Sequence, residues 1–354
     1  MRERGAQGPA AGDRAPGKRS GPESPARSGV DSAAGPPSVP RDPTLLAAGP
    51  GRQARAALWI ELSRPFTLVA PALGVVSGAI TAAGAAPREA WSLELIVYPV
   101  LGSLMAATLN AGNNALNQIY DLEIDRINKP KRPLPSGRLG VRDAWIFTLV
   151  TYIVALVLAW VVAPGGRHEC FWIVIAAVIA TFVYSCPPLR TKQRGIWANI
   201  TIAIPRGVLL KVAGWSCVKT VLGFEPWYIG TIFGLFLLGA STTKDFADME
   251  GDRRGGCRTL PIVYGVRTAA WMISPSFVLP FVVISIGAFT GVLTGNHLLL
   301  QLLAVGMTMY GAYVCYLMLR RPEELAVDEN HVSWAHMYRM MFVAQIGFAV
   351  AYLF

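Results

Sequence analysis

Long apolar stretches separated by short polar breaks run through the chain from residue 65 to its last residue. Each stretch is close to the ~20 residues that an α-helix needs to cross the hydrocarbon core of a bilayer. The stretches are continuously apolar and do not alternate, so helices rather than a β-barrel must satisfy the backbone. The pattern predicts an all-α polytopic membrane protein with about nine transmembrane helices, at 65–84, 93–116, 144–163, 170–186, 196–216, 226–243, 269–292, 297–319 and 338–354.

The first 55 residues differ from the rest, because they are rich in Gly, Pro, Ala, Ser and Arg and poor in aromatic and β-branched residues. Such a segment buries too little apolar area to offset the entropy of ordering it. No apolar core of a signal peptide precedes Leu45, and the prolines and acidic residues disfavour an organelle transit peptide. The sequence therefore predicts a disordered tail at 1–55 and one membrane domain at 56–354.

The overall composition agrees with a multi-pass integral membrane protein, since 53% of the 354 residues are hydrophobic and 15% are charged. The net charge of +10 comes mostly from Lys and Arg in the tail and in alternate loops between the spans. This distribution follows the positive-inside rule and does not indicate nucleic acid as a partner. We expect the N-terminus and the basic loops in the cytosol and the C-terminus outside, in the cell membrane or an organelle membrane. The five cysteines have no spacing typical of a zinc site or a disulfide framework.

An acidic motif marks the inner end of the second span, where Asn117, Asp121 and Asp125 recur every four residues in NQIYDLEID. One helix face would carry all three, and the two carboxylates would repel each other without a cation between them. Mg²⁺ prefers oxygen ligands and is commonly held by one or two carboxylates together with substrate phosphates. A magnesium site is the functional interpretation, and two solvated carboxylates at the end of a span are the structural alternative.

A second acidic motif lies at the inner end of the sixth span, where Lys244, Asp248 and Asp252 recur every four residues in TTKDFADMEGD. Each motif is followed by a basic loop, and a third inner loop, YSCPPLRTK, is basic as well. Carboxylates for a metal and cations for phosphate oxygens are the components of a diphosphate site. Two such motifs on the same side favour the metal site over solvated carboxylates.

The candidate site residues follow from these motifs. The predicted metal ligands, which are also the catalytic candidates together with Asn117, are Asp121, Asp125, Asp248 and Asp252. The predicted diphosphate contacts, each with an alternative role as a positive-inside residue, are Lys129, Arg132, Arg190, Lys192, Lys244, Asp245 and Arg253.

Further polar residues are expected to line the substrate cavity. Asn117 would orient a phosphate or a metal-bound water, with Asn113 and Asn114 near enough to assist. Tyr120 and Tyr184 are candidates to face a carbocation through their π faces, although interfacial tyrosines are common in membrane proteins. The fifth span contains two cations, Arg206 and Lys211, and a charge inside a span is costly. Both side chains can snorkel to the interface, so the predicted site does not include them.

The two acidic motifs resemble those of the UbiA superfamily of membrane prenyltransferases. NQIYDLEID matches its N-x3-D-x3-D motif, and DMEGD with Asp248 and Asp252 resembles its second, D-x3-D motif. YSCPPLRTK is similar to its YSxPPxRLK stretch, with Thr191 where Leu is usual, and Ser63-Arg64-Pro65 resembles its motif at the mouth of span one. The likeness covers roughly residues 60–320.

This resemblance implies a helical bundle around a central cavity in which Mg²⁺ assists ionisation of a polyprenyl diphosphate. The prenyl group would then pass to a lipid-soluble acceptor. NQIYDLEIDRINKP and the RGVLL of span five favour an aromatic, quinone-precursor acceptor, whereas RTLPIVYG favours a glycerolipid. We expect the aromatic acceptor because a phenol-type ring stabilises the charge formed on capture. A glycerolipid or tetrapyrrole hydroxyl is the alternative, with Asp245 as its base.

Two other classes remain open at this stage. A terpene cyclase on the same scaffold would ionise the same diphosphate without a second substrate. An ion-coupled transporter also carries membrane carboxylates, but usually near the bilayer midplane on broken helices, whereas these lie at span ends beside basic loops. The sequence indicates neither the prenyl chain length nor the oligomeric state.

Overall fold

The computed structural model describes residues 52–327 and 331–354, which belong to one compact unit. Within these ranges all regular secondary structure is helical, and no strand is present. The predicted disordered tail lies outside the described residues except for its last four positions, where α1 (Arg52–Ser63) begins.

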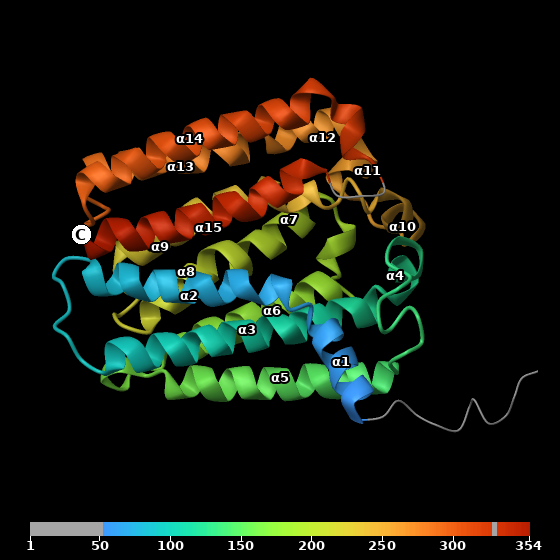
Figure 1. The fold of residues 1–354 in the computed structure, drawn as a ribbon, viewed down its shortest axis with the longest axis horizontal. Coiled ribbons are helices and arrows are strands. Elements are labelled where there is room, and N and C mark those ends of the chain that lie inside the picture. Colours follow the sequence, from blue (N-terminus) through green and yellow to red (C-terminus); the bar gives the residue numbers. More distant parts are fainter. Residues whose placement is uncertain (1–51, 328–330) are drawn as a thin grey trace, which may run out of the picture. The chain divides into compact units, whose positions relative to one another are not determined.

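A helical segment covers each of the predicted apolar ranges (Figure 1). They are α2 (Phe66–Gly84), α3 (Glu94–Tyr120), α5 (Val141–Val161), α6 (Glu169–Ser185), α7 (Ile196–Ala203) with η4 (Ile204–Leu209) and α8 (Leu210–Ser216), α9 (Phe224–Ala240), α12 (Val266–Ile273) with α13 (Pro275–Phe289), α14 (His297–Arg320) and α15 (Val332–Leu353). Among the described residues, six helical stretches are long and apolar enough to cross a membrane: Phe66–Gly84, Glu94–Tyr120, Val141–Val161, Ile196–Ser216, Val266–Phe289 and His297–Arg320. The shorter α6 is apolar as well.

Two of the predicted spans are not single α-helices. The fifth contains a π-helical turn, η4, which begins at Ile204 and Pro205. Proline cannot donate the hydrogen bond of a regular turn, and a π turn is one way to accommodate it. The seventh is divided at Ser274, and Pro275 is the first residue of α13, where its missing N–H costs nothing.

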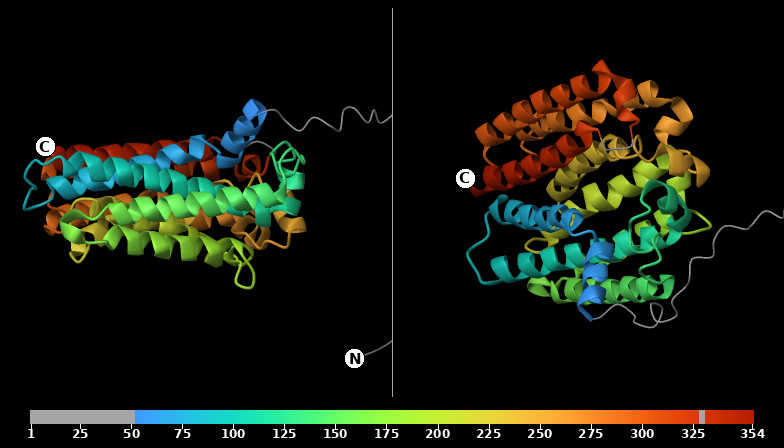
Figure 2. Two further views of the ribbon diagram at one scale, coloured as in Figure 1. Left: turned by 90° about the horizontal axis from the view of Figure 1, so that it is seen from below. Right: turned by 45° about the vertical axis from the view of Figure 1, so that its right-hand side comes forward.

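The helices form a closed ring. Each of the segments named above packs on the next along the chain, and α15 packs on α2, so that the last span closes against the first. The spans run roughly parallel to a common axis in both views of Figure 2. Closing the ring brings the ends of segments far apart in the sequence to the same end of the bundle.

Glycines permit the closest crossings in this ring. A Cβ on Gly78 of α2 would lie 2.8 Å from the carbonyl oxygen of Lys211 and 3.0 Å from the Cα of Gly214 in α8. On α14, a Cβ at Gly311 would overlap the carbonyl oxygen of Phe277 in α13. Small residues at such positions allow membrane helices to gain close backbone packing, which replaces the hydrophobic drive available in water.

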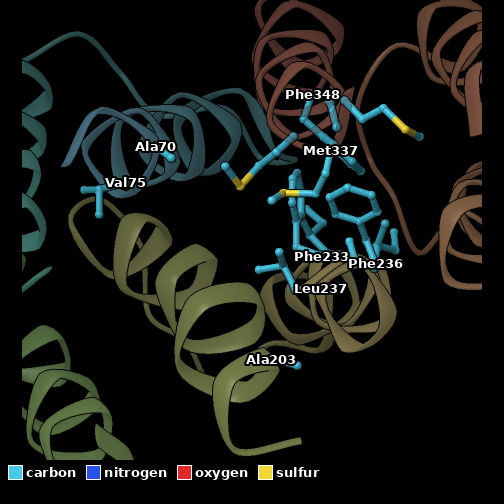
Figure 3. Packing of buried hydrophobic residues seen from close by; sticks show 14 of the residues in the cluster. Ala70, Val75, Ala203, Phe233, Phe236, Leu237, Met337 and Phe348 are labelled. Carbon is cyan, nitrogen blue, oxygen red and sulfur yellow. The ribbon is translucent and has the colours of Figure 1, made fainter. Parts of the chain in front are cut away.

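Large side chains fill the space between α9 and α15. Met337 and Phe348 of α15 point toward Phe233, Phe236 and Leu237 of α9 (Figure 3). The rings of Phe233 and Phe348 are tilted, with centroids 5.7 Å apart.

The outer faces of several helices expose large apolar side chains, among them Ile153, Val157, Leu279, Ile286, Leu302 and Met309. Apolar surface of this extent indicates a hydrocarbon environment.

We predict that Gly311→Ala lowers the thermal stability of the purified protein in detergent. The new methyl group must push α13 and α14 apart, at a cost of about 1–3 kcal/mol. Gly306→Ala on the same helix is the control, because a Cβ there has no neighbour within 4 Å. The melting temperature can be followed by size-exclusion chromatography after heating, and equal stability of the two variants would contradict this packing.

Candidate active site

The polar segments that follow three spans meet at one end of the bundle. They are α4 (Leu122–Asn128), the 3₁₀ turn η3 (Thr191–Gln193) and α10 (Met249–Arg254). α4 packs on α10, and the two lie side by side at the right of Figure 1. This end of the bundle therefore collects both acidic motifs and the basic loop between them.

The sequence pattern predicted that one uninterrupted α-helix carries the first acidic motif. In the structure this helix is interrupted within the motif. α3 ends at Tyr120, and Asp121 has φ −97° and ψ 14° before α4 begins. The helical hydrogen bonds nevertheless continue, from the Asp121 N–H to Asn117 O at 2.9 Å and from the Asp125 N–H to Asp121 O at 2.7 Å. The four-residue spacing therefore still aligns the three side chains.

Asn128, which the sequence analysis did not single out, joins the two acidic motifs. Its Nδ2 donates to the carbonyl oxygen of Asp248 at 2.9 Å, and its Oδ1 accepts from the Gly251 N–H at 2.9 Å. A Cβ on Gly251 would lie 2.5 Å from this amide, so only glycine leaves room for it. Asn128 thus fixes the first turn of α10 against the end of α4.

Lys192 lies between one aspartate of each motif. Its Nζ pairs with Asp121 and lies 3.8 Å from Asp252 Oδ1. Arg190 adds a second cation, 3.3 Å from Asp121 Oδ1, and also donates to the backbone oxygen of Tyr120 at 2.8 Å. Both carboxylates are almost fully buried. The basic loop thus supplies the cations that allow two acidic side chains to approach.

The other two aspartates are neutralised in the same way. Arg132 donates to Asp125 Oδ2 at 2.6 Å. Lys244 lies 2.7 Å from Asp248 Oδ2, and Lys129, which follows the first motif, lies 3.1 Å from Asp248 Oδ1. Five of the seven predicted diphosphate contacts therefore form ion pairs with the four predicted metal ligands.

These ion pairs shift the titration of their members. Burial opposes the charged form of Lys192, but Asp121, Tyr184 and Asp252 together outweigh it and raise the pKa of Lys192 above its usual range. For Asp248, burial acts to raise the pKa, but Lys244 and Lys129 hold it well below its usual range. Both groups are therefore charged at neutral pH.

Asp245 titrates differently. Burial, with Asp252 as the next contribution, raises the pKa of Asp245 to about 8, although Lys244 acts in the opposite direction. Burial also raises the pKa of Asp252. The carboxyl groups of Asp245 and Asp252 therefore ionise less readily than usual. Additional positive charge beside them would favour their ionised form.

The donor set fits a divalent metal, although the described residues contain no ready-made cluster of three or more His, Cys, Asp or Glu ligands. Four carboxylates from the two motifs are buried at this end, and Lys192 links Asp121 of the first motif to Asp252 of the second. Asp248 Oδ1 is buried and makes no hydrogen bond to a described residue, despite the nearby Lys129. Carboxylate oxygens with spare coordination capacity suit Mg²⁺, which keeps part of its shell for water and phosphate.

A cavity of about 230 Å³ extends from this end into the bundle. α2, α3, α6, the fifth span and α15 form its wall, with apolar side chains that include Ala70, Pro71, Met105, Ile173 and Met341. The polar end is lined by Asn117, Tyr184, Lys244 and Asp245. An apolar chamber with charged groups at one end can hold an amphiphile with a long hydrocarbon tail.

Two asparagines of α3, Asn113 and Asn114, make different hydrogen bonds. Asn114 donates to Ser63 O at 2.9 Å and to Thr67 Oγ1 at 2.8 Å, which holds the corner between α1 and α2. Asn113 Oδ1 accepts from the Tyr152 hydroxyl at 2.8 Å. Both side chains line the cavity beside Asn117.

Two predicted site residues neither line the cavity nor take part in the ion pairs with the four aspartates. Tyr120 packs edge-on against Trp145 of α5, with ring centroids 6.0 Å apart, and does not line the cavity wall. Arg253 is exposed on the outer side of α10, where an interfacial role fits better than a diphosphate contact.

Two arginines outside the predicted site do line the cavity, Arg64 and Arg206. Arg64 has φ 57°, and Arg190 is the other non-glycine residue with positive φ in the described chain. Strained backbone of this kind persists where the surroundings hold it, often at functional sites. Burial and the neighbouring guanidinium groups of Arg132 and Arg206 lower the pKa of Arg64 to about 10.

A helical membrane bundle with paired acidic motifs at one end of an apolar cavity defines an enzyme class that handles the diphosphate of a lipid substrate. The chain belongs to the UbiA prenyltransferase family, whose family model matches residues 72–336. It is therefore an integral membrane prenyltransferase, as the resemblance had predicted.

Similar proteins include synthases with two kinds of product. The chain is 26% identical over 295 residues to the digeranylgeranylglyceryl phosphate synthase of Methanosphaera stadtmanae, covering 83% of this chain and 99% of that protein. It is 31% identical over 214 residues to the bacteriochlorophyll synthase 33 kDa chain of Cereibacter sphaeroides, covering 60% of this chain and 67% of that protein. Among solved structures, a UbiA homolog from Archaeoglobus fulgidus bound to GPP and Mg²⁺ superposes with a TM-score of 0.64 at 20% identity, covering 83% of this chain and 99% of that one.

We predict that Asp121→Asn, Asp125→Asn, Asp248→Asn and Asp252→Asn each reduce turnover by about 100-fold or more, since each removes a charged oxygen from a shared site. The variants should still insert and purify as the wild type does. Turnover can be measured with a radiolabelled prenyl diphosphate in detergent. Activity within about threefold of wild type for any two variants would refute these roles.

We predict that Asn128→Ala raises the Mg²⁺ concentration for half-maximal activity about tenfold, because residues that orient metal ligands typically affect affinity by 10–100-fold. Excess Mg²⁺ should restore most of the activity. Asn296→Ala is the control, because this asparagine makes a helix-capping hydrogen bond to the Leu299 N–H in another part of the fold. A lower maximal rate with an unchanged Mg²⁺ requirement would show that Asn128 does not position the ligands.

Proposed function

We propose that the protein transfers the prenyl group of an allylic polyprenyl diphosphate to the hydroxyl of a glycerolipid phosphate. The supporting observation for the donor is the cavity, whose polar end is lined by Asn117 of the first acidic motif and by Lys244 and Asp245 of the second. GPP and Mg²⁺ are bound in the Archaeoglobus fulgidus homolog, which supports the same pair of ligands for this chain.

Asp121, Asp125, Asp248 and Asp252 would hold Mg²⁺, which when bound neutralises charge on the departing diphosphate. The cations that pair with these aspartates would then donate to phosphate oxygens. The diphosphate is thereby kept at the charged end, and the hydrocarbon chain lies along the apolar wall. That wall keeps water from the allylic carbon, where water would otherwise capture the cation.

The acceptor assignment rests on the relatives. The digeranylgeranylglyceryl phosphate synthase is matched over 99% of its length, against 67% for the bacteriochlorophyll synthase chain. These names support the hydroxyl acceptors that the sequence analysis had kept as its alternative, rather than the aromatic acceptor it had preferred. Asp245 lines the cavity and would take the proton of a hydroxyl acceptor. A tetrapyrrole acceptor is the second candidate, on the strength of the bacteriochlorophyll synthase match.

The orientation in the membrane belongs to the same proposal. A helical segment at each of the nine predicted ranges fits nine crossings, with both acidic motifs at one end of the ring. The alternate basic loops support a cytosolic location for that end. Substrates would reach the site from the inner leaflet.

We predict that the purified protein with Mg²⁺ and labelled geranylgeranyl diphosphate prenylates a long-chain alkylglycerol phosphate. The measurement is product identification by mass spectrometry across a panel that also contains a tetrapyrrole acceptor and hydroxylated aromatic acids. Turnover confined to the aromatic acids would refute the glycerolipid assignment.

The Asp248→Asn variant is the control for this panel, and a product that it forms as fast as the wild type is not enzymatic. A cyclised hydrocarbon formed equally with and without acceptor would identify a cyclase instead. Prenyl transfer to any acceptor would exclude the transporter alternative.

A further inference from the structure

Two cations of the cavity wall lack a carboxylate partner among the described residues. Arg64 and Arg206 line the cavity, but neither forms an ion pair with a carboxylate of the described residues. The cations that do pair with the acidic motifs are Lys129, Arg132, Arg190, Lys192 and Lys244. Positive charge that the protein leaves without a carboxylate beside a cavity is available to an anionic ligand.

Arg206 lies well inside the fifth span, where an unpaired charge is costly and usually serves a ligand. It occupies the π-helical turn η4, and π turns within α-helices occur frequently at functional sites. A Cβ on Gly207 would lie 2.5 Å from the Cα of Gly234, so this turn is packed tightly against α9. The backbone that carries Arg206 is thus fixed on the side opposite the cavity.

Asn110 of α3 orients the guanidinium. Its Oδ1 accepts from Arg206 Nη2 at 3.4 Å, while its Nδ2 donates to the carbonyl oxygen of Thr67 at 3.0 Å. Asn110 precedes Asp121 by 11 residues, which corresponds to about 16 Å along α3. Arg206 is therefore removed from the acidic motifs and faces a deeper part of the same cavity.

Arg64 lies between these two positions. Its carbonyl oxygen accepts from Thr67 Oγ1 at 2.9 Å, and Asn114 holds the same corner. Burial is the main cause of the lowered pKa of Arg64, and the nearby guanidinium groups of Arg132 and Arg206 lower it further. Two guanidinium groups that face one cavity repel each other until an anion lies between them.

We propose that Arg206, flanked by Arg64, forms an anion subsite for the acceptor, separate from the diphosphate subsite. The acceptor then carries a phosphate or carboxylate in addition to its reacting group. This inference rests on the proposed prenyl transfer and specifies the acceptor class that the cavity accepts. A charge-assisted contact of this kind corresponds to about 10- to 100-fold in acceptor preference.

The test compares a long-chain alkylglycerol phosphate with the same alkylglycerol lacking the phosphate. Wild-type protein should prefer the phosphate by about 10- to 100-fold in kcat/KM. Arg206→Gln should remove this preference while the KM for the prenyl diphosphate stays within about twofold, and Arg206→Lys should retain part of it. Arg142→Gln, at an exposed arginine of α5, is the matched control and should behave as the wild type.

Three results would overturn the proposal. In the first, Arg206→Gln keeps the wild-type preference. In the second, the variant raises the KM for the prenyl diphosphate and leaves the preference intact, which would assign Arg206 to the donor. In the third, inorganic phosphate competes as well as the alkylglycerol phosphate does, which would assign the subsite to free phosphate.

Failure of the proposed acceptor is distinguishable from failure of the subsite. If wild-type protein prenylates neither alkylglycerol, the glycerolipid assignment is wrong, and the same variants are compared on a hydroxylated aromatic carboxylic acid and its methyl ester. Selectivity for the free acid that Arg206→Gln abolishes would support the anion subsite. Equal selectivity in wild type and variant, or no selectivity in either, would refute it.

Discussion

Four carboxylates buried at the end of an apolar bundle must be neutralised, and much of the site's structure follows from that requirement. A buried charge without a partner costs several kcal/mol. The structure meets this cost with five cations that pair with the aspartates, and Lys192 lies between one aspartate of each motif. Each of these cations is held by a carboxylate that also suits Mg²⁺. The ion pairs therefore stabilise the buried carboxylates and also hold the cations where they would bind the diphosphate.

The closed ring of helices makes this convergence possible. Asn128 and Asp248 are 120 residues apart in the chain, yet they share a hydrogen bond because α15 closes on α2 and α4 packs on α10. Glycines such as Gly78 and Gly214 set how closely the helices cross. Packing inside the membrane therefore determines the geometry of a site at its surface.

The cavity has two kinds of positive charge, and the difference between them carries functional meaning. Cations beside the acidic motifs are paired and can change partners when metal and diphosphate bind. Arg64 and Arg206 have no carboxylate partner among the described residues and point to a second anion in the same chamber. A donor with its charge at one end and an acceptor with its own charge deeper inside would be held with their reacting groups between the two.

The sequence by itself determined the helical class, the position of each apolar segment and the two acidic motifs, because hydrophobic length and four-residue spacing are local properties. It also identified, as candidate diphosphate contacts, the Lys and Arg residues that pair with the aspartates. Only the tertiary structure decided which cation meets which aspartate, that Tyr120 faces α5, and that Asn128 joins the motifs, since these depend on helix rotation and on contacts between distant segments. The environment of Arg206 could not be predicted from the sequence either. Its π turn and its hydrogen bond with Asn110 depend on how α3 and the fifth span pack together.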